Sequence, residues 1–262
     1  MTFKDKRVWI TGASSGIGEA LAIAFHQAGA RLILSARRED ELNRVQAACG
    51  GPPNTLVLPL DMSRSEELAE KARAAQVMFG GVDILVLNAG ITQRSLTRDT
   101  AEAVYRRLME VNFFGPEALT RAVLPSMLEN KSGHFVVISS VAGKFGVPLR
   151  SGYSATKFAL HGFYEALRAE EERNGIHVTL VCPGYIRTQI SLSALKGDGG
   201  SHAKMDPELA RGMSADECAR QILQGVAREK KEIVVAAGRE KMLAYMKRFF
   251  PGALARMLGR AR

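Results

Sequence analysis

Near the start of the chain lies the glycine-rich stretch Thr11-Gly-Ala-Ser-Ser-Gly-Ile-Gly18. An apolar run at 7–11 precedes it and predicts a strand, and a helical pattern follows it through Ala28. Glycines let the backbone of such a turn approach a pyrophosphate, and the helix N-terminus supplies N–H groups and a favourable dipole. The stretch therefore predicts either an anion-binding turn for a dinucleotide or a tight strand-to-helix turn that binds nothing.

Further apolar runs alternate with helical patterns along the chain. We expect strands at 31–35, 55–60, 82–87, 134–139, 177–181 and 232–235, and helices at about 63–79, 100–130, 153–173 and 214–229. No break in composition separates these segments, so they predict a doubly wound parallel sheet in one α/β domain. Ligands of such sheets bind beyond the carboxyl ends of the strands. A polar, glycine-containing stretch at 189–213 predicts a loop or lid over that edge.

The residues after the second strand indicate which dinucleotide binds. In dinucleotide folds an acidic residue near this point contacts the ribose hydroxyls, whereas an arginine accommodates a 2′-phosphate. The chain has Ala36 in place of an acid, and Arg37 and Arg38 follow it. This pattern favours NADPH over NADH, although two solvated arginines at a helix start would look the same.

A tyrosine and a lysine lie four residues apart in Ser151-Gly-Tyr-Ser-Ala-Thr-Lys157, at the start of a predicted helix. Residues at this spacing share a helix face. A free tyrosine has a pKa near 10, and a positive charge within about 4–6 Å typically lowers a pKa by roughly 1–3 units. We therefore expect Lys157 to lower the pKa of Tyr153 and allow the phenol to exchange a proton with an alcohol or carbonyl oxygen. Most such pairs are solvated helix neighbours, so the motif alone is weak.

Composition limits the class of protein. With 262 residues, 46% hydrophobic and 24% charged, the chain can bury one substantial core. Its three cysteines lack metal-ligand spacing and are typical of reduced cytosolic thiols, and its five scattered histidines do not predict a metal site. An apolar run is reached by Val8 and no apolar run has 18 residues, so we expect no signal peptide, membrane anchor or membrane span and a cytoplasmic location.

These motifs together resemble the short-chain dehydrogenase/reductase family. They occur in the family's order over about residues 6–235 and are Thr11-Gly-x-x-x-Gly16-Ile-Gly18, Asn88-Ala-Gly90, Asn112, Ser140, Tyr153-x-x-x-Lys157 and Pro183-Gly184. The chain looks closest to the family's microsomal group, which includes acyl-dihydroxyacetone-phosphate reductase and hydroxysteroid dehydrogenases, through the stretches 111–116 and 183–188 and its tail. The resemblance implies a single-domain Rossmann fold with a seven-stranded parallel sheet and a C-terminal helical extension.

The resemblance also implies roles for four catalytic residues. Tyr153 would be the general acid in carbonyl reduction, and Lys157 would lower its pKa and hold the nicotinamide ribose. Ser140 would hydrogen-bond the substrate oxygen, and Asn112 would fix a water that links Lys157 to solvent. All four are present in the chain, so the resemblance implies an enzyme that acts on CH–OH and C=O groups.

A larger set of residues would bind NADP(H) by the same resemblance. Asp61 would contact the adenine, Asn88 and Gly90 the cofactor side of the fourth strand, and Thr188 the nicotinamide amide. The full predicted set is Gly12, Ser14, Ser15, Gly16, Ile17, Gly18, Arg37, Arg38, Asp61, Met62, Asn88, Ala89, Gly90, Tyr153, Lys157, Pro183, Gly184, Ile186 and Thr188.

Three functions compete. The first is an NADPH-dependent reductase of an apolar ketone or aldehyde, such as a lipid- or steroid-like carbonyl. The second is a non-catalytic NADP-binding protein, because a fold does not determine a function. The third is an adaptor at a membrane surface or on nucleic acid, although no nucleic-acid-binding motif supports the latter. We favour the reductase, acting as a homodimer or homotetramer through the helices at about 100–130 and 153–173.

The tail at 239–262 carries +6 of the chain's net charge of +9. Apolar residues recur in it at near-helical spacing, and Pro251-Gly252 predicts a break into two short helices. We treat residues 1–238, with the loop at about 189–213, as the NADP-binding domain and the tail as its basic amphipathic extension. Two interpretations of the tail remain open: its apolar stripe packs on the body or on a dimer partner, or it rests on anionic lipid.

Overall fold

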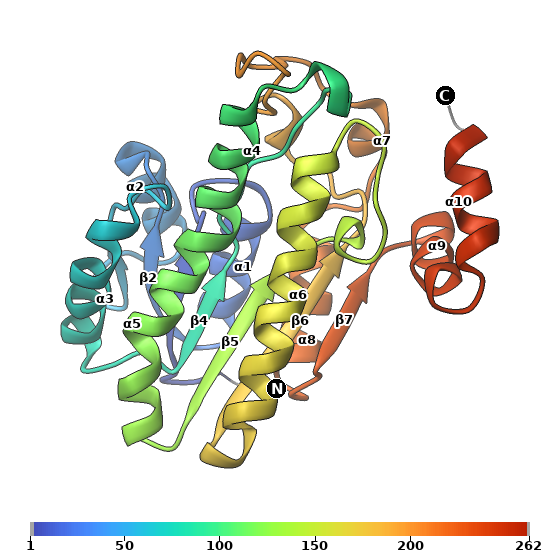
Figure 1. Cartoon of the computed structure of the whole chain (residues 1–262). Helices are drawn as coiled ribbons and strands as arrows, with labels where there is room; N and C mark the ends of the chain where they lie inside the picture. Colours follow the sequence, from blue (N-terminus) through green and yellow to red (C-terminus); the bar gives the residue numbers. More distant parts are fainter. Residues whose placement is uncertain (1–2, 261–262) are drawn as a thin grey trace.

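Seven parallel strands form one sheet in the computed structural model, which describes residues 3–260 (Figure 1). The strand order is β3-β2-β1-β4-β5-β6-β7, and it reverses between β1 and β4. This confirms the doubly wound α/β fold, whose ligand crevice lies at that reversal. The strands are β1 (Arg7–Thr11), β2 (Arg31–Ser35), β3 (Thr55–Val57), β4 (Ile84–Leu87), β5 (Gly133–Ile138), β6 (Ile176–Pro183) and β7 (Glu232–Val235).

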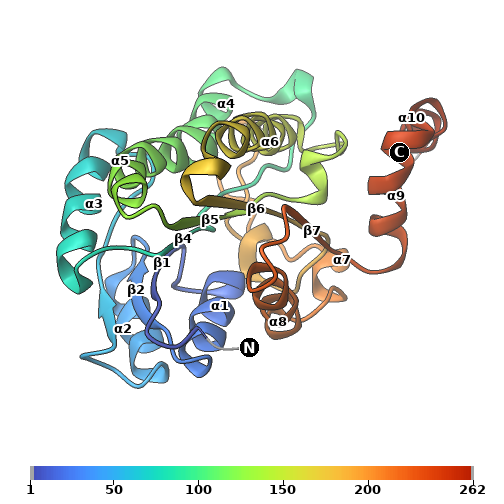
Figure 2. The same ribbon diagram turned by 90° about the horizontal axis from the view of Figure 1, so that it is seen from below.

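Helices cover both faces of the sheet (Figure 2). One face carries α1 (Gly16–Gln27), α2 (Glu39–Ala48) and α8 (Ala215–Val226). The other face carries α3 (Ser65–Phe79), α5 (Gly115–Glu129) and α6 (Ser151–Glu171). Each set of helices covers its own hydrophobic core, so the sheet is buried on both sides.

The strand sequences are apolar throughout because both faces of the sheet are covered. In β1, Val8 and Ile10 point into the core under α1, whereas Trp9 points into the core under α5. The indole of Trp9 donates to the hydroxyl of Ser35 over 2.8 Å, so the polar atom of this buried ring has a partner. Alternate residues of this short strand thus belong to the two cores in turn.

Two predicted elements differ in the structure. β3 ends at Val57 instead of residue 60, although the amides of Leu58 and Leu60 still bond to the chain of β2 and the residue after it. The helix expected at 100–130 is divided into α4 (Glu102–Met109), a π-helical turn (Glu110–Phe114) and α5. Pro116, at the start of α5, has no amide hydrogen to donate, so the regular bond ladder is interrupted where the π turn passes into α5.

The tail forms the two predicted helices, α9 (Gly238–Phe249) and α10 (Pro251–Arg260), with the break at Pro251. They form a pair beside the end of β7 (Figure 1). Leu243 and Leu254 are buried against Val141 and Phe145 of the main domain, which confirms packing on the body. Residues 261–262 of the predicted extension lie outside the described residues. Within 3–260, no helix is both long and apolar enough to cross a bilayer.

Candidate active site

The glycine-rich turn joins β1 to α1 at the carboxyl edge of the sheet. Gly12 and Gly16 have φ angles of +66° and +59°, a region that side chains disfavour. A Cβ built on Gly12 would lie 2.8 Å from the Cα of Ala89, so backbone fills this position. The turn therefore brings the N-terminal amides of α1 to the crevice, where an anion could accept from them.

A hydrogen-bond network fastens this turn to the end of β4. The side-chain amide of Asn88 donates to the carbonyl oxygens of Thr11 and Gly12, at 3.0 and 3.1 Å. The hydroxyl of Thr11 accepts from the amides of Asn88 and Ala89, at 3.0 and 3.1 Å, and donates to Val86 O at 3.2 Å. The turn is thus held rigidly before any ligand binds. The motif did not reveal this structural role of Thr11.

A cleft of about 540 Å³ opens above the turn. Most of the predicted coenzyme residues line it: Gly12, Ser14, Ser15, Gly16, Ile17, Arg37, Arg38, Asp61, Met62, Asn88, Ala89, Gly90 and Thr188. Residues that the sequence analysis did not assign also line it, namely Ala36, Leu60, Ile91, Val111, Gln189, Ile190, Leu192, Ser193 and Ser201. The loop at 189–213 therefore forms one wall of the cleft, as its position after β6 indicated.

Charged side chains mark the end of the cleft beyond β2. Arg38 lies 3.5 Å from the hydroxyl of Ser14, measured from Nη2 to Oγ, and Arg37 lines the same wall. Burial alone would raise the pKa of Asp61, but the amide and hydroxyl of Ser63 donate to Oδ1, at 2.9 and 2.8 Å, and hold that pKa below its ordinary value. This end thus presents two cations and one fixed carboxylate.

Six predicted coenzyme residues do not line this cleft. Gly18 lies behind the turn, where a Cβ would come within 2.1 Å of Gly12 O. Ile186 is buried, and Gly184 packs against Ala236 and Glu240 at the start of the tail. Pro183 ends β6, and Tyr153 and Lys157 lie on α6. The structure therefore places the end of β6 beside the start of the tail.

Lys157 and Asn112 meet at the end of β4. The ammonium of Lys157 donates to Ile138 O over 2.8 Å, and its burial lowers its pKa to about 8. Asn112 sits in the π turn, where Oδ1 accepts from the amide of Ile91 at 2.8 Å and Nδ2 donates to Ile91 O at 2.9 Å. A Cβ on Gly90 would be 3.2 Å from Asn112 Oδ1 and 3.8 Å from Lys157 Nζ. Both side chains are therefore locked in place beside Gly90.

The structure does not bear out the expected effect of Lys157 on Tyr153. Its Nζ lies 5.6 Å from the centre of the tyrosine ring. Desolvation raises the pKa of Tyr153, and this outweighs a hydrogen bond with Ser140 and the positive charges of Arg150 and Arg94, which lower it. Burial raises the pKa of the phenol more than these partners lower it. The two cations that lower this pKa, Arg150 and Arg94, lie outside the Tyr153-x-x-x-Lys157 motif.

Ser140 follows β5 and begins a 3₁₀ turn (Val141–Gly143). Its Oγ accepts from the amide of Ala142 at 3.1 Å and lies 3.4 Å from Pro183 O, to which it can donate. A hydrogen bond between this hydroxyl and the phenol of Tyr153 brings the two groups together. The four predicted catalytic residues thus come from the π turn, the end of β5 and one face of α6, and they converge at the carboxyl edge of the sheet.

One group of potential metal ligands converges elsewhere in the described residues. His161, Glu165 and Glu232 place one ligand atom each within 4.8 Å of one another. The ammonium of Lys144 pairs with Glu232, and burial lowers the pKa of His161. A cation would have to displace that ammonium, so the geometry gives no reason to assign a metal here.

Comparisons with known proteins agree with this geometry. A family profile described as short chain dehydrogenase matches residues 6–198. A Drosophila melanogaster protein called dehydrogenase/reductase SDR family protein 7-like is 45% identical over 94% of this chain and 77% of its own length. The Danio rerio protein called dehydrogenase/reductase SDR family member 7B is 41% identical over 99% of this chain and 86% of its own.

Solved structures share the fold. A short-chain dehydrogenase from Streptomyces avermitilis superimposes with a TM-score of 0.84 at 31% identity and covers 98% of this chain and 96% of its own. A Burkholderia cenocepacia short chain dehydrogenase in complex with NADP has a TM-score of 0.82 at 23% identity, with 98% and 99% of the two chains covered. At that identity the second likeness concerns the fold alone.

Proposed function

This chain belongs to the short-chain dehydrogenase family of NAD(P)-dependent oxidoreductases, and we propose that it reduces a ketone or aldehyde with NADPH, using Tyr153 as proton donor. The convergence of Tyr153, Ser140, Lys157 and Asn112 beside the dinucleotide-sized cleft carries this proposal. A binding protein without activity would have no need for a buried lysine and a serine–tyrosine contact at the same edge.

The cleft fits a dinucleotide. Its glycine turn has no room for side chains and directs the N-terminal amides of α1 towards a pyrophosphate. Arg37 and Arg38 line the far end, where the 2′-phosphate of NADPH would find charge-assisted partners. The bound coenzyme would supply a hydride. Lys157 would hold its nicotinamide ribose near the end of β4, and Asn112 would fix a water that links Lys157 to solvent.

Tyr153 suits the role of an acid in reduction. Because desolvation raises its pKa, the phenol is protonated at neutral pH and has a proton to give. Ser140 would bind the same carbonyl oxygen and direct it to the phenol. The apolar side chains of Ile91, Val111 and Ile190 at the cleft favour an apolar substrate such as a lipid- or steroid-like carbonyl.

The test is Tyr153→Phe, which removes only the hydroxyl. We expect turnover to fall about 10²-fold or more while NADPH binding stays within about threefold, because general acids contribute about 10²–10⁴ in rate. The matched control is Tyr105→Phe, which removes a hydroxyl 3.1 Å from Ser151 Oγ at the start of the same helix and should leave turnover intact. A panel of ketones and aldehydes, followed by NADPH oxidation, provides the substrate. Near-normal turnover in Tyr153→Phe would refute the assignment.

We also propose a homo-oligomer that pairs through α5 and α6. Phe114, directly before α5, and Phe158 on α6 are each 43% exposed, so a partner that covered them would bury apolar surface. Light scattering should give a dimer or tetramer at micromolar concentration. Phe158→Asp should shift it towards the monomer, whereas Phe250→Asp on the tail should not.

The tail favours a second role at an anionic membrane. Met242, Tyr245 and Phe249 recur on one face of α9 and are 49%, 53% and 66% exposed, and Lys241 and Arg248 flank them. Exposed aromatic residues beside lysines and arginines are typical of interfacial helices. We therefore propose that the enzyme is cytoplasmic and works at lipid surfaces, where apolar carbonyls partition.

Vesicle sedimentation tests this role without truncating the packed tail. The protein should bind vesicles that contain phosphatidylserine and not pure phosphatidylcholine. Each charge reversal at Lys241 or Arg248 should weaken binding about fivefold or more. Phe249→Ser should weaken it further, and the control Val77→Ser, which changes an 82% exposed residue on α3, should not. Equal binding by all variants would refute the lipid surface.

A further inference from the structure

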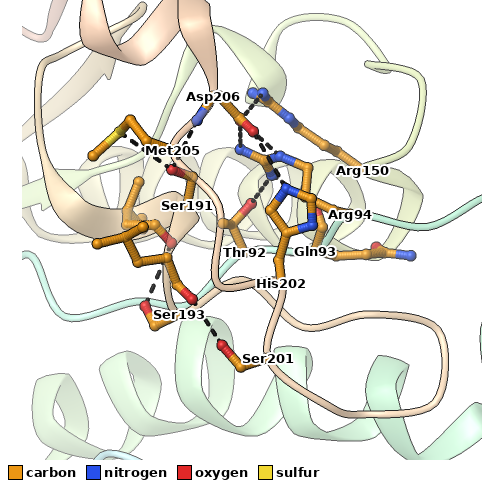
Figure 3. Close-up of polar contacts among 12 residues, drawn as sticks. Thr92, Gln93, Arg94, Arg150, Ser191, Ser193, Ser201, His202, Met205 and Asp206 are labelled. Carbon is orange, nitrogen blue, oxygen red and sulfur yellow. Dashed lines mark hydrogen bonds and ion pairs between the residues drawn. The ribbon is translucent and has the colours of Figure 1, made fainter.

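Three charged side chains from separate segments meet beside the catalytic helix (Figure 3). Oδ2 of Asp206 accepts from Nε of Arg94 at 2.8 Å and from Nη2 of Arg150 at 3.2 Å. Nη2 of Arg94 donates to the same oxygen. The side chains of Arg94, Asp206 and Arg150 are only 7%, 13% and 17% exposed. The cluster is therefore an ion-paired network shielded from water, with two cations on one carboxylate.

The network joins the substrate loop to two fixed walls of the site. Asp206 lies in the loop at 189–213, directly before the short helix α7 (Pro207–Ala210). Arg94 follows β4, and Arg150 directly precedes α6, three residues before Tyr153. Arg150 also lies over the ring of Tyr185, 5.7 Å from its centre, at the stem of the same loop. One carboxylate thus connects the loop to both the β4 end and the catalytic helix.

The carboxylate of Asp206 does not cap the helix that follows it. An aspartate at a helix N-cap commonly accepts from the helix's own amides, but Asp206 makes no such bond to α7. Its amide instead donates to Ser191 Oγ at 3.2 Å, within the loop, and its Oδ1 lies 3.7 Å from Nε2 of His202. The side chain is therefore turned away from its own helix and towards the arginines (Figure 3).

Backbone bonds already hold the other end of the loop. The amide of Leu195 donates to Thr92 O and the amide of Arg94 donates to Leu195 O, both at 2.8 Å, and Ala101 donates to Gly197 O at 2.9 Å. These bonds place the loop tip along the segment after β4. The Asp206 end is held by side chains, and loss of its carboxylate would leave two guanidinium groups close together with little water to screen them.

We propose that Asp206 is a positioning residue: its bonds to Arg94 and Arg150 clasp the loop at 189–213 closed and so set the fraction of enzyme that can bind the carbonyl substrate. The loop supplies Gln189, Ile190 and Leu192 to the cleft wall, so its position shapes the site. Closure also fixes the two arginines near the phenol of Tyr153, whose pKa their charges lower against the larger effect of burial. When only a fraction of the enzyme has the loop closed and can bind substrate, the apparent affinity for the substrate is reduced by that fraction.

Asp206→Asn tests the clasp by removing charge while keeping shape. Hydrogen exchange of the loop amides His202 and Ala203, which both have backbone acceptors within the loop, should accelerate at least about tenfold. The matched control is Asp198→Asn in the same loop, because Asp198 is exposed and bonds only across its own turn, to the amide of Gly200 at 2.8 Å. Exchange in this control should match the wild type.

A kinetic readout separates positioning from a general structural role. The KM of Asp206→Asn for the best carbonyl of the panel should rise about tenfold or more, while kcat at saturation falls less than about threefold, because bound substrate draws the loop closed. Asp206→Glu should recover part of the lost affinity. This arm rests on the proposed reductase function, whereas the exchange arm does not, so failure of one is distinguishable from failure of the other.

Arg150→Gln is a second test of the clasp, for use if the aspartate variant folds poorly. It removes one ion pair and leaves the pair between Arg94 and Asp206 in place. We expect a smaller acceleration of loop exchange, about threefold. Loop exchange at the wild-type rate in Asp206→Asn or Arg150→Gln would overturn the proposal. So would an Asp206→Asn protein whose kcat falls while KM is constant, because that pattern means fewer intact active sites and not a displaced loop.

Discussion

Gly18→Ala should damage coenzyme binding and stability together. Gly18 lies in the first turn of α1, and its φ is not in the left-handed region, so backbone conformation does not forbid a side chain. The obstacle is space, because an added Cβ would lie 2.1 Å from Gly12 O and 2.6 Å from the side-chain amide of Asn88. Non-bonded carbon contacts are normally about 3.5 Å or longer. The helix and the turn must therefore separate by more than an ångström.

The expected magnitude follows from that displacement. Forcing extra atoms into a packed site typically costs about 1–3 kcal/mol, which corresponds to a fall in Tm of about 3–10 °C for a domain of this size. Separation would also stretch the bonds from Asn88 to Thr11 O and Gly12 O, now 3.0 and 3.1 Å, and move the α1 amides from the pyrophosphate position. We expect NADPH to bind at least about tenfold more weakly.

Calorimetric titration with NADPH and a thermal melt of the same sample measure both effects. Gly259→Ala is the control, because that helical glycine has no atom within 4 Å of its added Cβ and alanine is the better helix former. Wild-type affinity and Tm in Gly18→Ala would contradict the close approach of α1 to the turn, and with it the reason for assigning the cleft to a dinucleotide.

Three further outcomes follow from individual side chains. Burial holds the pKa of His134 at about 3, against 6.5 ordinarily. Between these two pH values the unfolded chain binds more protons than the folded chain. The free energy of unfolding should therefore fall as pH drops from 6.5 towards 3, by up to about 1.4 kcal/mol per pH unit. His134→Gln should flatten that slope in urea unfolding. Arg37→Ala should weaken NADPH binding about tenfold and leave NADH binding unchanged by titration. Leu243→Ala, at the buried contact of the tail, should lower the unfolding free energy by about 2–5 kcal/mol in the same urea assay.

The parts of the fold that were predictable are those that local sequence patterns determine. Each central strand is an apolar run because helices cover both faces of the sheet, so β1, β2 and β5 could be placed within about a residue. The break before α10 was predictable because Pro251 cannot continue a helix. The position of Ser140 and Tyr153 at one edge follows from the parallel order of the strands, which the alternation of strands and helices indicates.

Other features depend on contacts between distant residues and leave no local signal. The π turn at 110–114 places Asn112 against the backbone of Ile91, and no spacing in the sequence announces that shift. The pKa of Tyr153 is raised by burial and lowered less by two arginines, one of them 59 residues away in the chain. The motif of Tyr153 and Lys157 reveals none of these effects. Nothing in the sequence distinguishes Asp206 from other loop acids, because its partners Arg94 and Arg150 reach it only after folding.

The two halves of the site are held by different forces, and this difference fits their tasks. The coenzyme turn is fastened by backbone bonds and by the buried hydroxyl of Thr11, so it cannot relax without loss of the β1–β4 edge. The substrate wall is a loop whose Asp206 end is tied by one carboxylate to two arginines. Low-stability elements open locally while the core stays folded. A change at Asp206 should therefore loosen the loop while the glycine turn keeps its place. A change at Thr11 should displace the turn itself, because α1 and the end of β4 are both positioned relative to that edge.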